Sequence, residues 1–495
     1  MSSPIRNLEP HSLWGYFSDL NAVPRPSKKE QRVIAFMQSF GQRLGLPVHT
    51  DEVGNVLITK PATAGRANDP VVALQSHLDM VHQKNAGTSF DFETEGIRML
   101  LEGDWVRAEG TTLGADNGIG VAAMMSLLAS SDIPHPPLEA LFTIDEETGM
   151  TGAKGLRGGL LQAQILLNLD TEEDRELTIG CAGGVDVLAS CKYAPQTPVG
   201  LSFFCVNLKG LAGGHSGMEI HLGRGNANKL MNRFLLEVGK RFGGRLHWLD
   251  GGGLRNAIPR ESKAILGIPE GRVAEFLSYV TEFELVVQKE YATTDPELRF
   301  EAETVSGTPS VVDEEFQDKF LRAIYAVDHG IYRMSPDVTG LVQTSNNLAR
   351  VHLEDGELKV QCLTRGSLDS EKMDQARAIV CALELMGCEV ILKGEYPGWA
   401  PRPQASIVQL MKDTYLELFG SEPTVTACHA GLECGILGKN YPDVEMISFG
   451  PNIRGAHSPD ERVQVSSVQK FWTFLTTTLS RITSVREPEA ITSGQ

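Results

Sequence analysis

The chain has 495 residues, of which 41% are hydrophobic and 22% charged, proportions typical of a globular protein. Its 45 Lys and Arg against 63 Asp and Glu give a net charge of −18, which disfavours partners such as nucleic acid or an anionic membrane surface. The length predicts two or three domains with ample hydrophobic core. The eight cysteines contain no C-x-x-C pair, which indicates mostly buried thiols in a reducing compartment.

The N-terminal segment, MSSPIRNLEPHSLWGYF, lacks the apolar stretch of a signal peptide. The most apolar run, residues 121–129, is much shorter than the roughly 20 residues that cross a bilayer. We therefore expect a cytoplasmic protein.

The first third of the chain alternates short apolar runs with helical patterns. Buried strands are predicted at 71–74, 138–144 and 165–169, with a helix at 117–129. This alternation is typical of an α/β domain.

The pattern then changes at the polar, Pro-containing segment YAPQTPVG, after which a strand is predicted at 201–208. A second breaker at 395–403 precedes an amphipathic helix at 405–418 and a strand at 444–449. We interpret the chain as an α/β domain interrupted by a long insertion, from about residue 185 to about residue 396.

Five segments share one feature. In each of them, a histidine or a carboxylate directly follows an apolar run. Ligands in α/β sheets gather beyond the carboxyl ends of the strands, so these side chains are expected to converge. The residues are His77 and Asp79, Asp116, Glu146 and Glu147, Asp170, and His457.

Two imidazoles and three carboxylates from this set suit Zn²⁺ or Mn²⁺. If Asp116 bridges two ions, a bridging hydroxide balances the remaining charge and can attack a carbonyl that the metals polarise. Glu146 would take a proton from this water and pass it to the leaving amine. In an extended segment Glu147 would face the metal and Glu146 the water, because neighbouring side chains point in opposite directions.

Asp79 is predicted to orient the His77 imidazole through a hydrogen bond. Each motif also has a plainer explanation, since H-x-D, E-E-x-G and GAHSPDE can be polar loops and Asp116 can cap a helix. The shared placement of all five segments favours the metal site.

The sequence resembles the M20 family of metallopeptidases, and most of all its aminoacyl-histidine dipeptidase branch. The motifs that carry the resemblance are SHLDMV, GTTLGADNGIG, DEETGMTGAKGL, LNLDTEE, GGHSGMEIHLGRGNANK, RNAIPRES and GPNIRGAHSPDE, in family order over nearly the whole chain. The resemblance implies a di-zinc catalytic domain, with a mixed sheet flanked by helices, that an inserted α+β lid domain interrupts. The expected boundaries are 1–185 and 397–495 for the catalytic domain and 186–396 for the lid.

The resemblance assigns metal ligation to His77, Asp116, Glu147, Asp170 and His457. It makes Glu146 the general acid/base and Asp79 the orienting carboxylate.

The same resemblance suggests substrate-binding residues. His215 in GGHSG is similar to a lid histidine that donates a hydrogen bond to the oxyanion of the tetrahedral intermediate. Asn256 and Arg365 are candidates to hold the substrate backbone or its C-terminal carboxylate, although Arg365 could instead form a structural ion pair. Glu433 and His429 could meet a free α-amine or an imidazole. Whether His215 acts within its own chain or across a homodimer stays open.

The expected function is hydrolysis of dipeptides with a free N-terminus, of broad specificity that includes Xaa-His, with two divalent ions as cofactors. Zinc is the expected metal, with manganese or cobalt as alternatives. A tripeptidase or an N-acyl amino acid deacylase of the same family is the alternative enzyme. A non-catalytic metal-binding scaffold is the alternative outside catalysis, and the retained Glu146 disfavours it. The chain has no G-x-S-x-G, H-E-x-x-H or G-x-x-x-x-G-K-[ST] motif.

Overall fold

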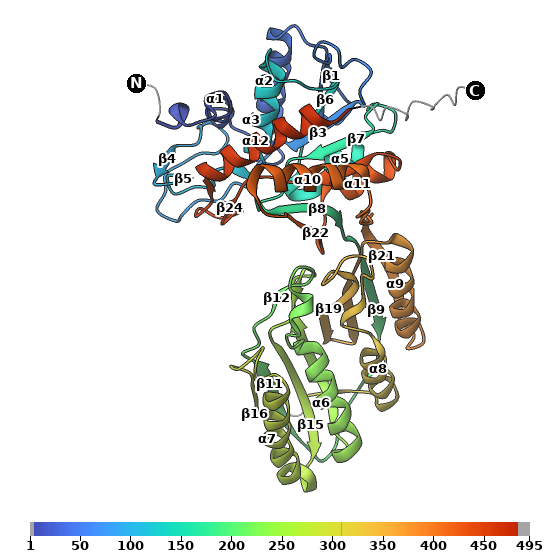
Figure 1. Ribbon diagram of the computed structural model, residues 1–495. Coiled ribbons are helices and arrows are strands. Elements are labelled where there is room, and N and C mark those ends of the chain that lie inside the picture. Colours follow the sequence, from blue (N-terminus) through green and yellow to red (C-terminus); the bar gives the residue numbers. More distant parts are fainter. Residues whose placement is uncertain (1–3, 308, 484–495) are drawn as a thin grey trace, which may run out of the picture. The chain divides into compact units, whose positions relative to one another are not determined.

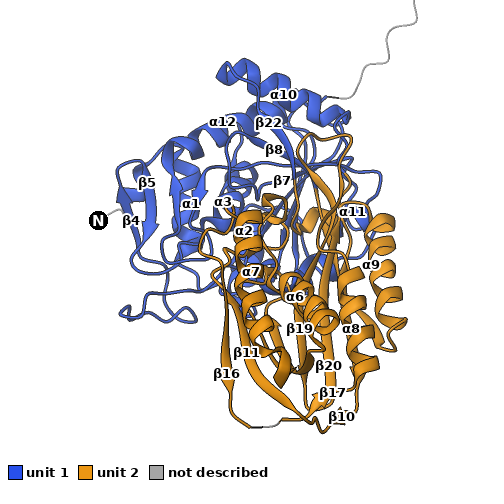
Figure 2. Cartoon of the chain, turned by 90° about the horizontal axis from the view of Figure 1, so that it is seen from below, with its two compact units in different colours: residues 1–180, 401–427, 436–495 blue, residues 181–400, 428–435 orange. Residues whose placement is uncertain are grey.

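The computed structural model describes residues 4–307 and 309–483. The chain forms two compact units (Figure 2). Unit 1 comprises Met1–Gly180, Pro401–Ala427 and Ile436–Gln495, and unit 2 comprises Cys181–Ala400 and Cys428–Gly435. Within the described residues, no helix has the length and apolar character needed to cross a membrane. The roles of catalytic domain and lid stay predictions.

Unit 1 is built on an eight-stranded sheet with the strand order β1-β2-β6-β3-β7-β23-β8-β22 (Figure 1). The four strands β6, β3, β7 and β23 run parallel, and antiparallel neighbours flank them, so the sheet is mixed as predicted. The strands are β1 (Val48–Thr50), β2 (Val56–Lys60), β3 (Val72–His77), β6 (Leu138–Thr143), β7 (Ile165–Asn168), β8 (Glu176–Cys181), β22 (Thr424–Cys428) and β23 (Glu445–Ser448).

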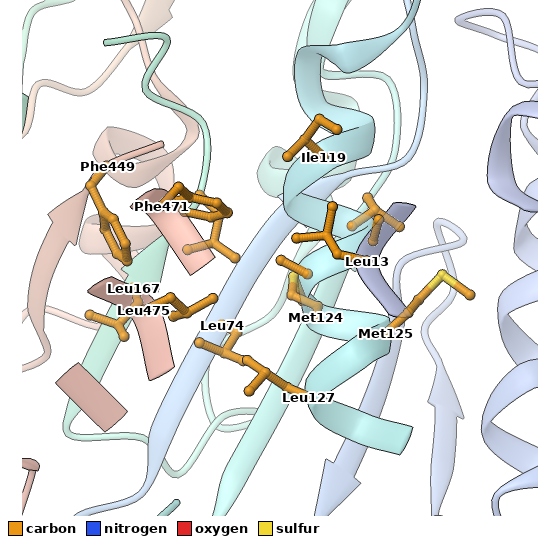
Figure 3. Packing of buried hydrophobic residues seen from close by; sticks show 14 of the residues in the cluster. Leu13, Leu74, Ile119, Met124, Met125, Leu127, Leu167, Phe449, Phe471 and Leu475 are labelled. Carbon is orange, nitrogen blue, oxygen red and sulfur yellow. The ribbon is translucent and has the colours of Figure 1, made fainter. Parts of the chain in front are cut away.

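Helices complete the core of unit 1. Helix α3 (Ala115–Ala129) is apolar on nearly all sides because it packs against both α1 (His11–Asn21) and β3. One cluster joins side chains of α3, the strands and α12 (Val465–Arg481), among them Leu127, Leu74 and Leu475 (Figure 3). The other helices are η1 (Pro4–Asn7), α2 (Gln31–Arg43), α4 (Glu146–Gly149), α5 (Thr151–Gly155), α10 (Ser406–Phe419) and α11 (Glu433–Asn440), the last of which continues from unit 2.

A smaller antiparallel sheet of unit 1 joins segments from the two ends of the chain. Its order is β24-β25-β5-β4, with β24 (Ile453–Arg454), β25 (Arg462–Gln464), β5 (Trp105–Ala108) and β4 (Met99–Glu102). The connection between β24 and β25 carries His457. This sheet therefore anchors the late histidine to an early part of the chain.

Unit 2 contains a nine-stranded sheet in the order β16-β11-β15-β13-β19-β20-β9-β21, with β18 added beside β19. The neighbouring strands of this sheet pair in antiparallel orientation. The strands are β9 (Gly183–Lys192), β11 (Leu201–Lys209), β13 (Arg245–Gly252), β15 (Ser262–Pro269), β16 (Arg299–Val305), β18 (Gly330–Met334), β19 (Val342–Glu354), β20 (Glu357–Gly366) and β21 (Glu389–Tyr396).

The core of unit 2 includes a group of aromatic rings around Phe234 of helix α6 (Ala227–Phe242). The ring of Tyr279, from α7 (Val273–Glu290), stacks on Phe234 with centroids 5.7 Å apart. Two further helices, α8 (Glu314–Ala326) and α9 (Asp369–Glu384), add to this core. The short elements are η2 (Ile220–Leu222), η3 (Glu270–Arg272) and the two-strand ladders β10 (Pro195–Gln196) with β17 (Val311–Val312) and β12 (Gly214–His215) with β14 (Ala257–Ile258).

The fold class is confirmed, and the predicted strands and helices differ from the observed ones only at their ends. The prediction for the cysteines holds only in part. Cys181, Cys362, Cys388 and Cys434 are buried, whereas Cys381 is exposed and the others are intermediate.

Candidate metal centre

Five of the predicted residues lie together in unit 1 as two groups that share Asp116. Potential ligand atoms of His77, Asp116 and Asp170 lie within 4.8 Å of one another, and so do those of Asp116, Glu147 and His457. Asp116 presents Oδ1 to His77 Nε2 at 3.1 Å and Oδ2 to His457 Nε2 at 3.4 Å. One carboxylate therefore belongs to both groups.

Three of these residues lie at the carboxyl ends of parallel strands. His77 is the last residue of β3, Glu147 follows β6 and Asp170 follows β7. Because β6, β3 and β7 are adjacent and parallel, their ends meet at one edge of the sheet. Asp116 comes from the start of α3, and His457 from the turn between β24 and β25.

The spacing of the donor atoms fits divalent ions. Two ligand atoms that bind the same tetrahedral zinc ion, each at about 2.0 Å from it, lie about 3.3 Å from one another. His77 Nε2 is 3.4 Å from Asp170 Oδ1, and His457 Nε2 is 3.0 Å from Glu147 Oε2. The second oxygen of Glu147, Oε1, is buried, and no hydrogen-bond donor among the described residues reaches it. Imidazole nitrogen and carboxylate oxygen are suitable ligands for zinc or manganese.

The electrostatics of the centre favour bound positive charge. Burial raises the pKa of Glu147 and of Asp170, and burial beside Asp116 and Asp170 raises the pKa of Glu172 to about 8. Hydrogen bonds to Asp116 and Glu147 raise the pKa of His457 to about 11. Carboxylates crowded in a buried site repel one another unless cations lie between them.

Asp79 has a wider role in the geometry than the sequence suggested. Its carboxylate accepts the backbone N–H groups of Glu146 at 3.0 Å and Glu147 at 3.3 Å and the hydroxyl of Ser27 at 2.8 Å. His77 Nδ1 is 3.1 Å from the backbone carbonyl of Asp79 and 3.4 Å from its carboxylate. Asp79 therefore holds the Glu146–Glu147 turn as well as facing the imidazole.

The expectation of an extended backbone at Glu146 and Glu147 is wrong. Both residues lie in the short helix α4, which begins directly after Asp145 in a left-handed conformation with φ 53°. Neighbouring side chains on a helix diverge by about 100° rather than 180°. The two side chains can still serve different partners, but the turn, and not strand alternation, separates them.

In unit 2, His215 lies in β12, whose partner β14 follows Asn256. The N–H groups of Gly217 and Met218 donate to His215 Nδ1 at 3.2 and 3.0 Å. A neutral imidazole with an accepting Nδ1 carries its proton on Nε2. Burial and the nearby Arg365 lower the pKa of His215, which favours this neutral form.

Arg365 lies close to the His215 turn. A Cβ built on Gly217 would lie 3.1 Å from Arg365 Nε and 2.1 Å from the carbonyl of His429. Arg365 donates to the hydroxyl of Tyr396 at 2.9 Å, whereas its buried Nε has no acceptor among the described residues. Among the described residues, the carboxylate of Asp186 forms its salt bridge with Arg255, and the role of Arg365 stays a prediction.

The remaining two candidates of unit 2 are buried. His429 Nε2 lies 2.8 Å from Ser345 Oγ, and burial together with the positive charge of Arg365 lowers its pKa to about 3. Glu433 is 1% exposed at the first residue of α11. His215, Arg365 and His429 thus form one polar neighbourhood within unit 2.

Comparison with known proteins identifies the family of the chain. The model of Peptidase family M20/M25/M40 matches residues 73–481. The chain belongs to this family. It is 42% identical over 482 residues to the cytosol non-specific dipeptidase of Escherichia coli K12, covering 97% of this chain and 99% of that protein.

Two solved structures extend the comparison. The aminoacylhistidine dipeptidase of Vibrio alginolyticus matches with a TM-score of 0.92 and 40% identity, over 97% of this chain and 98% of that one. The aminopeptidase PepT of Bacillus cereus has a TM-score of 0.57 at 15% identity, over 96% and 99% of the two chains, which shows a shared fold. Membership of the M20 family makes the chain a hydrolase of peptide bonds that uses divalent metal.

Sequence reasoning missed two residues that hold parts of the candidate metal centre in place. Asn117 donates to the carboxylate of Asp170 and to the carbonyl of Leu169. The carboxylate of Glu461 accepts hydrogen bonds from four successive backbone N–H groups, the last of which belongs to Asp116. Both belong to quoted motifs, GTTLGADNGIG and GPNIRGAHSPDE, but contacts to backbone atoms leave no periodic pattern in a sequence.

Proposed function

We propose that the protein is a metal-dependent dipeptidase that cleaves dipeptides with a free N-terminus, including Xaa-His dipeptides. The observation that carries this proposal is the pair of ligand groups sharing Asp116, with Glu146 beside the second group. The similarity to the two dipeptidases over nearly the whole chain supports the substrate class.

The two ligand groups would hold two divalent ions, with zinc favoured over manganese or cobalt. His77 and Asp170 would serve one ion, Glu147 and His457 would serve the other, and Asp116 would bind both. When bound, the ions lower the pKa of a water molecule and polarise the carbonyl of the scissile bond. The distances between ligand atoms support this assignment because they match those around a tetrahedral ion.

Glu146 acts as the general base and acid. Its carboxylate takes a proton from the attacking water and returns it to the leaving amine. Asp79 is the positioning residue, because it holds the backbone of Glu146 and faces the His77 imidazole. Support for these two roles comes from the hydrogen bonds of Asp79 to the α4 turn.

Unit 2 supplies groups that recognise the substrate. The neutral His215 donates from Nε2 to the oxyanion, since its Nδ1 already accepts two N–H groups. Arg365 holds the C-terminal carboxylate, supported by its buried Nε without an acceptor among the described residues. Asn256 contacts the substrate backbone, and Glu433 meets the free α-amine. His429 is a second candidate to meet the free α-amine or an imidazole side chain of the substrate.

The protein is a cytoplasmic enzyme in this proposal, in agreement with the name of its E. coli relative. A homodimer is the alternative state, in which His215 would serve the active site of the partner. Sedimentation of the purified protein at several concentrations distinguishes monomer from dimer.

The first experiment measures hydrolysis of Gly-His, β-Ala-His, Ala-Leu, a tripeptide and an N-acetyl amino acid by chelator-stripped protein, with and without added Zn²⁺ or Mn²⁺. We expect metal-restored cleavage of the dipeptides, with the acetylated substrate intact. Cleavage of the acetylated substrate alone would identify a deacylase, and preference for the tripeptide a tripeptidase. Two bound ions without any cleavage would indicate a scaffold protein.

A further inference from the structure

The carboxylate of Glu461 is buried in unit 1, with 2% of the residue exposed. It accepts hydrogen bonds from four successive backbone N–H groups. Oε2 receives those of Leu113 at 2.7 Å and Gly114 at 2.9 Å, and Oε1 receives those of Ala115 at 2.7 Å and Asp116 at 3.3 Å. One side chain therefore holds the whole segment that leads into Asp116.

The segment has the backbone form that proteins use to bind anions. Gly114 is left-handed, with φ 72° and ψ 30°, directly before the first residues of α3. Successive N–H groups around such a residue converge on a single point and make a concave anion site. In this chain the carboxyl group of Glu461 lies at this position.

Arg25 fixes the opposite side of the same segment. Its Nη2 donates to the carbonyl of Gly114 at 2.6 Å, and its Nη1 donates to the carbonyls of Leu78 at 3.1 Å and Asp79 at 3.2 Å. A Cβ on Gly114 would lie 2.5 Å from Arg25 Nη2, so only glycine fits this position. The guanidinium thus ties the Asp116 segment to the residues that follow His77.

Glu461 also belongs to the turn that carries His457. It lies four residues beyond His457, and its N–H donates to the carbonyl of Ser458 at 3.1 Å. His457 itself has a positive φ of 65°, so the turn holds this residue in a conformation that side chains rarely adopt. The Glu461 contacts are therefore a direct connection between the segments of Asp116 and His457.

We propose that Glu461 is a positioning residue of the metal centre, whose carboxylate sets the shared Asp116 at the correct distance from His457. The proposal rests on the proposed two-metal function and adds a residue to it. Four N–H groups require both oxygens of a carboxylate. An amide in its place would turn an NH₂ group toward two of these donors and leave them unsatisfied.

We expect Glu461→Gln to lower the affinity for the ion held by Glu147 and His457 by about 10- to 100-fold. Substitution of residues that hold metal ligands in place typically lowers metal affinity by about this factor. The kcat for a dipeptide should fall by a similar factor, with little change in KM. Asp460→Asn is the matched control. Asp460 is the residue before Glu461 and its side chain is exposed, so this substitution removes a carboxylate without changing the buried contacts. This variant should keep wild-type affinity.

The experiment titrates Zn²⁺ into chelator-stripped wild type, Glu461→Gln and Asp460→Asn by calorimetry, and measures zinc content after gel filtration. Two ions bound by Glu461→Gln with wild-type affinity and wild-type kcat would overturn the proposal. An equal loss in Asp460→Asn would also overturn it, because the effect would then be one of charge alone.

Circular dichroism first establishes that each variant is folded. If Glu461→Gln does not fold, Glu461→Asp replaces it, because aspartate keeps the charge but is shorter by one methylene. Reduced zinc affinity in Glu461→Asp supports the proposal, and unchanged affinity overturns it. Wild type that binds two zinc ions but cleaves no dipeptide would refute the proposed function, while the affinity comparison would still decide the role of Glu461.

Discussion

The carboxylate of Asp79 accepts the backbone N–H of Glu146 at 3.0 Å. This contact links the segment after β3 to the first turn of α4, which carries both the proposed base Glu146 and the proposed ligand Glu147. The residue expected to orient one imidazole therefore also holds the backbone of Glu146.

Asp79→Asn should lower kcat for a dipeptide by about 10- to 100-fold, because an amide cannot accept from both N–H groups of α4 and face His77 as well. Steady-state kinetics with zinc present measures this change. Ser27→Ala is the control, since it removes a donor to Asp79 and leaves the carboxylate in place. Equal kcat in Asp79→Asn and wild type would show that the contact does not position the base.

Glu146→Gln should keep both metal ions and lose about 10²–10⁴-fold in kcat, the usual contribution of a general acid or base. Metal analysis and single-turnover hydrolysis of the same preparation separate binding from chemistry. Turnover at the wild-type rate would reject Glu146 as the base.

Asp116→Ala should reduce the number of tightly bound ions below two, because its two oxygens face His77 and His457 separately. Zinc content after dialysis against a weak chelator is the measurement. A variant that retains two tightly bound ions would contradict the shared-carboxylate assignment.

His215→Ala should lower kcat about 10²–10³-fold and change KM little, because an oxyanion donor acts mainly in the transition state. A rise in KM at constant kcat would instead indicate that His215 binds the ground-state substrate. The control is His221→Ala, because His221 is an exposed histidine six residues away, in η2.

Acid should destabilise unit 2 through His429. Burial, followed by the charge of Arg365, lowers the pKa of His429 to about 3, whereas an unfolded histidine titrates near 6.5. Between these values the unfolded chain binds more protons, so the free energy of unfolding falls as the pH falls. From pH 7 to pH 5 the loss for one such group is about 2 kcal/mol.

The His429→Gln variant lacks this titrating group. From pH 7 to pH 5, the free energy of unfolding of the variant should therefore fall by about 2 kcal/mol less than that of wild type. Urea unfolding at pH 7 and pH 5 tests the difference. Parallel pH profiles for the two proteins would show that His429 titrates normally in the folded state.

The strands of unit 1 could be predicted because strands buried on both faces are continuous apolar runs with abrupt polar ends. His77 and Asp170 stand at such ends, which is why they were found from the sequence alone. The α4 turn was not found, since the backbone at Glu146 depends on the N–H contacts to Asp79. Glu461 and Arg25 were missed for the same reason, because their partners are backbone atoms distant in the chain.

The position of β23 between β7 and β8 has a consequence for synthesis of the protein. Strands β7 and β8 follow each other in the chain, yet the strand that separates them in the sheet is made more than 250 residues later. On the ribosome, His77, Asp116 and Asp170 emerge early, whereas His457 emerges near the end. A nascent chain that ends before residue 457 therefore lacks one member of the candidate group of Asp116, Glu147 and His457, and this group is complete only after the turn between β24 and β25 has been made.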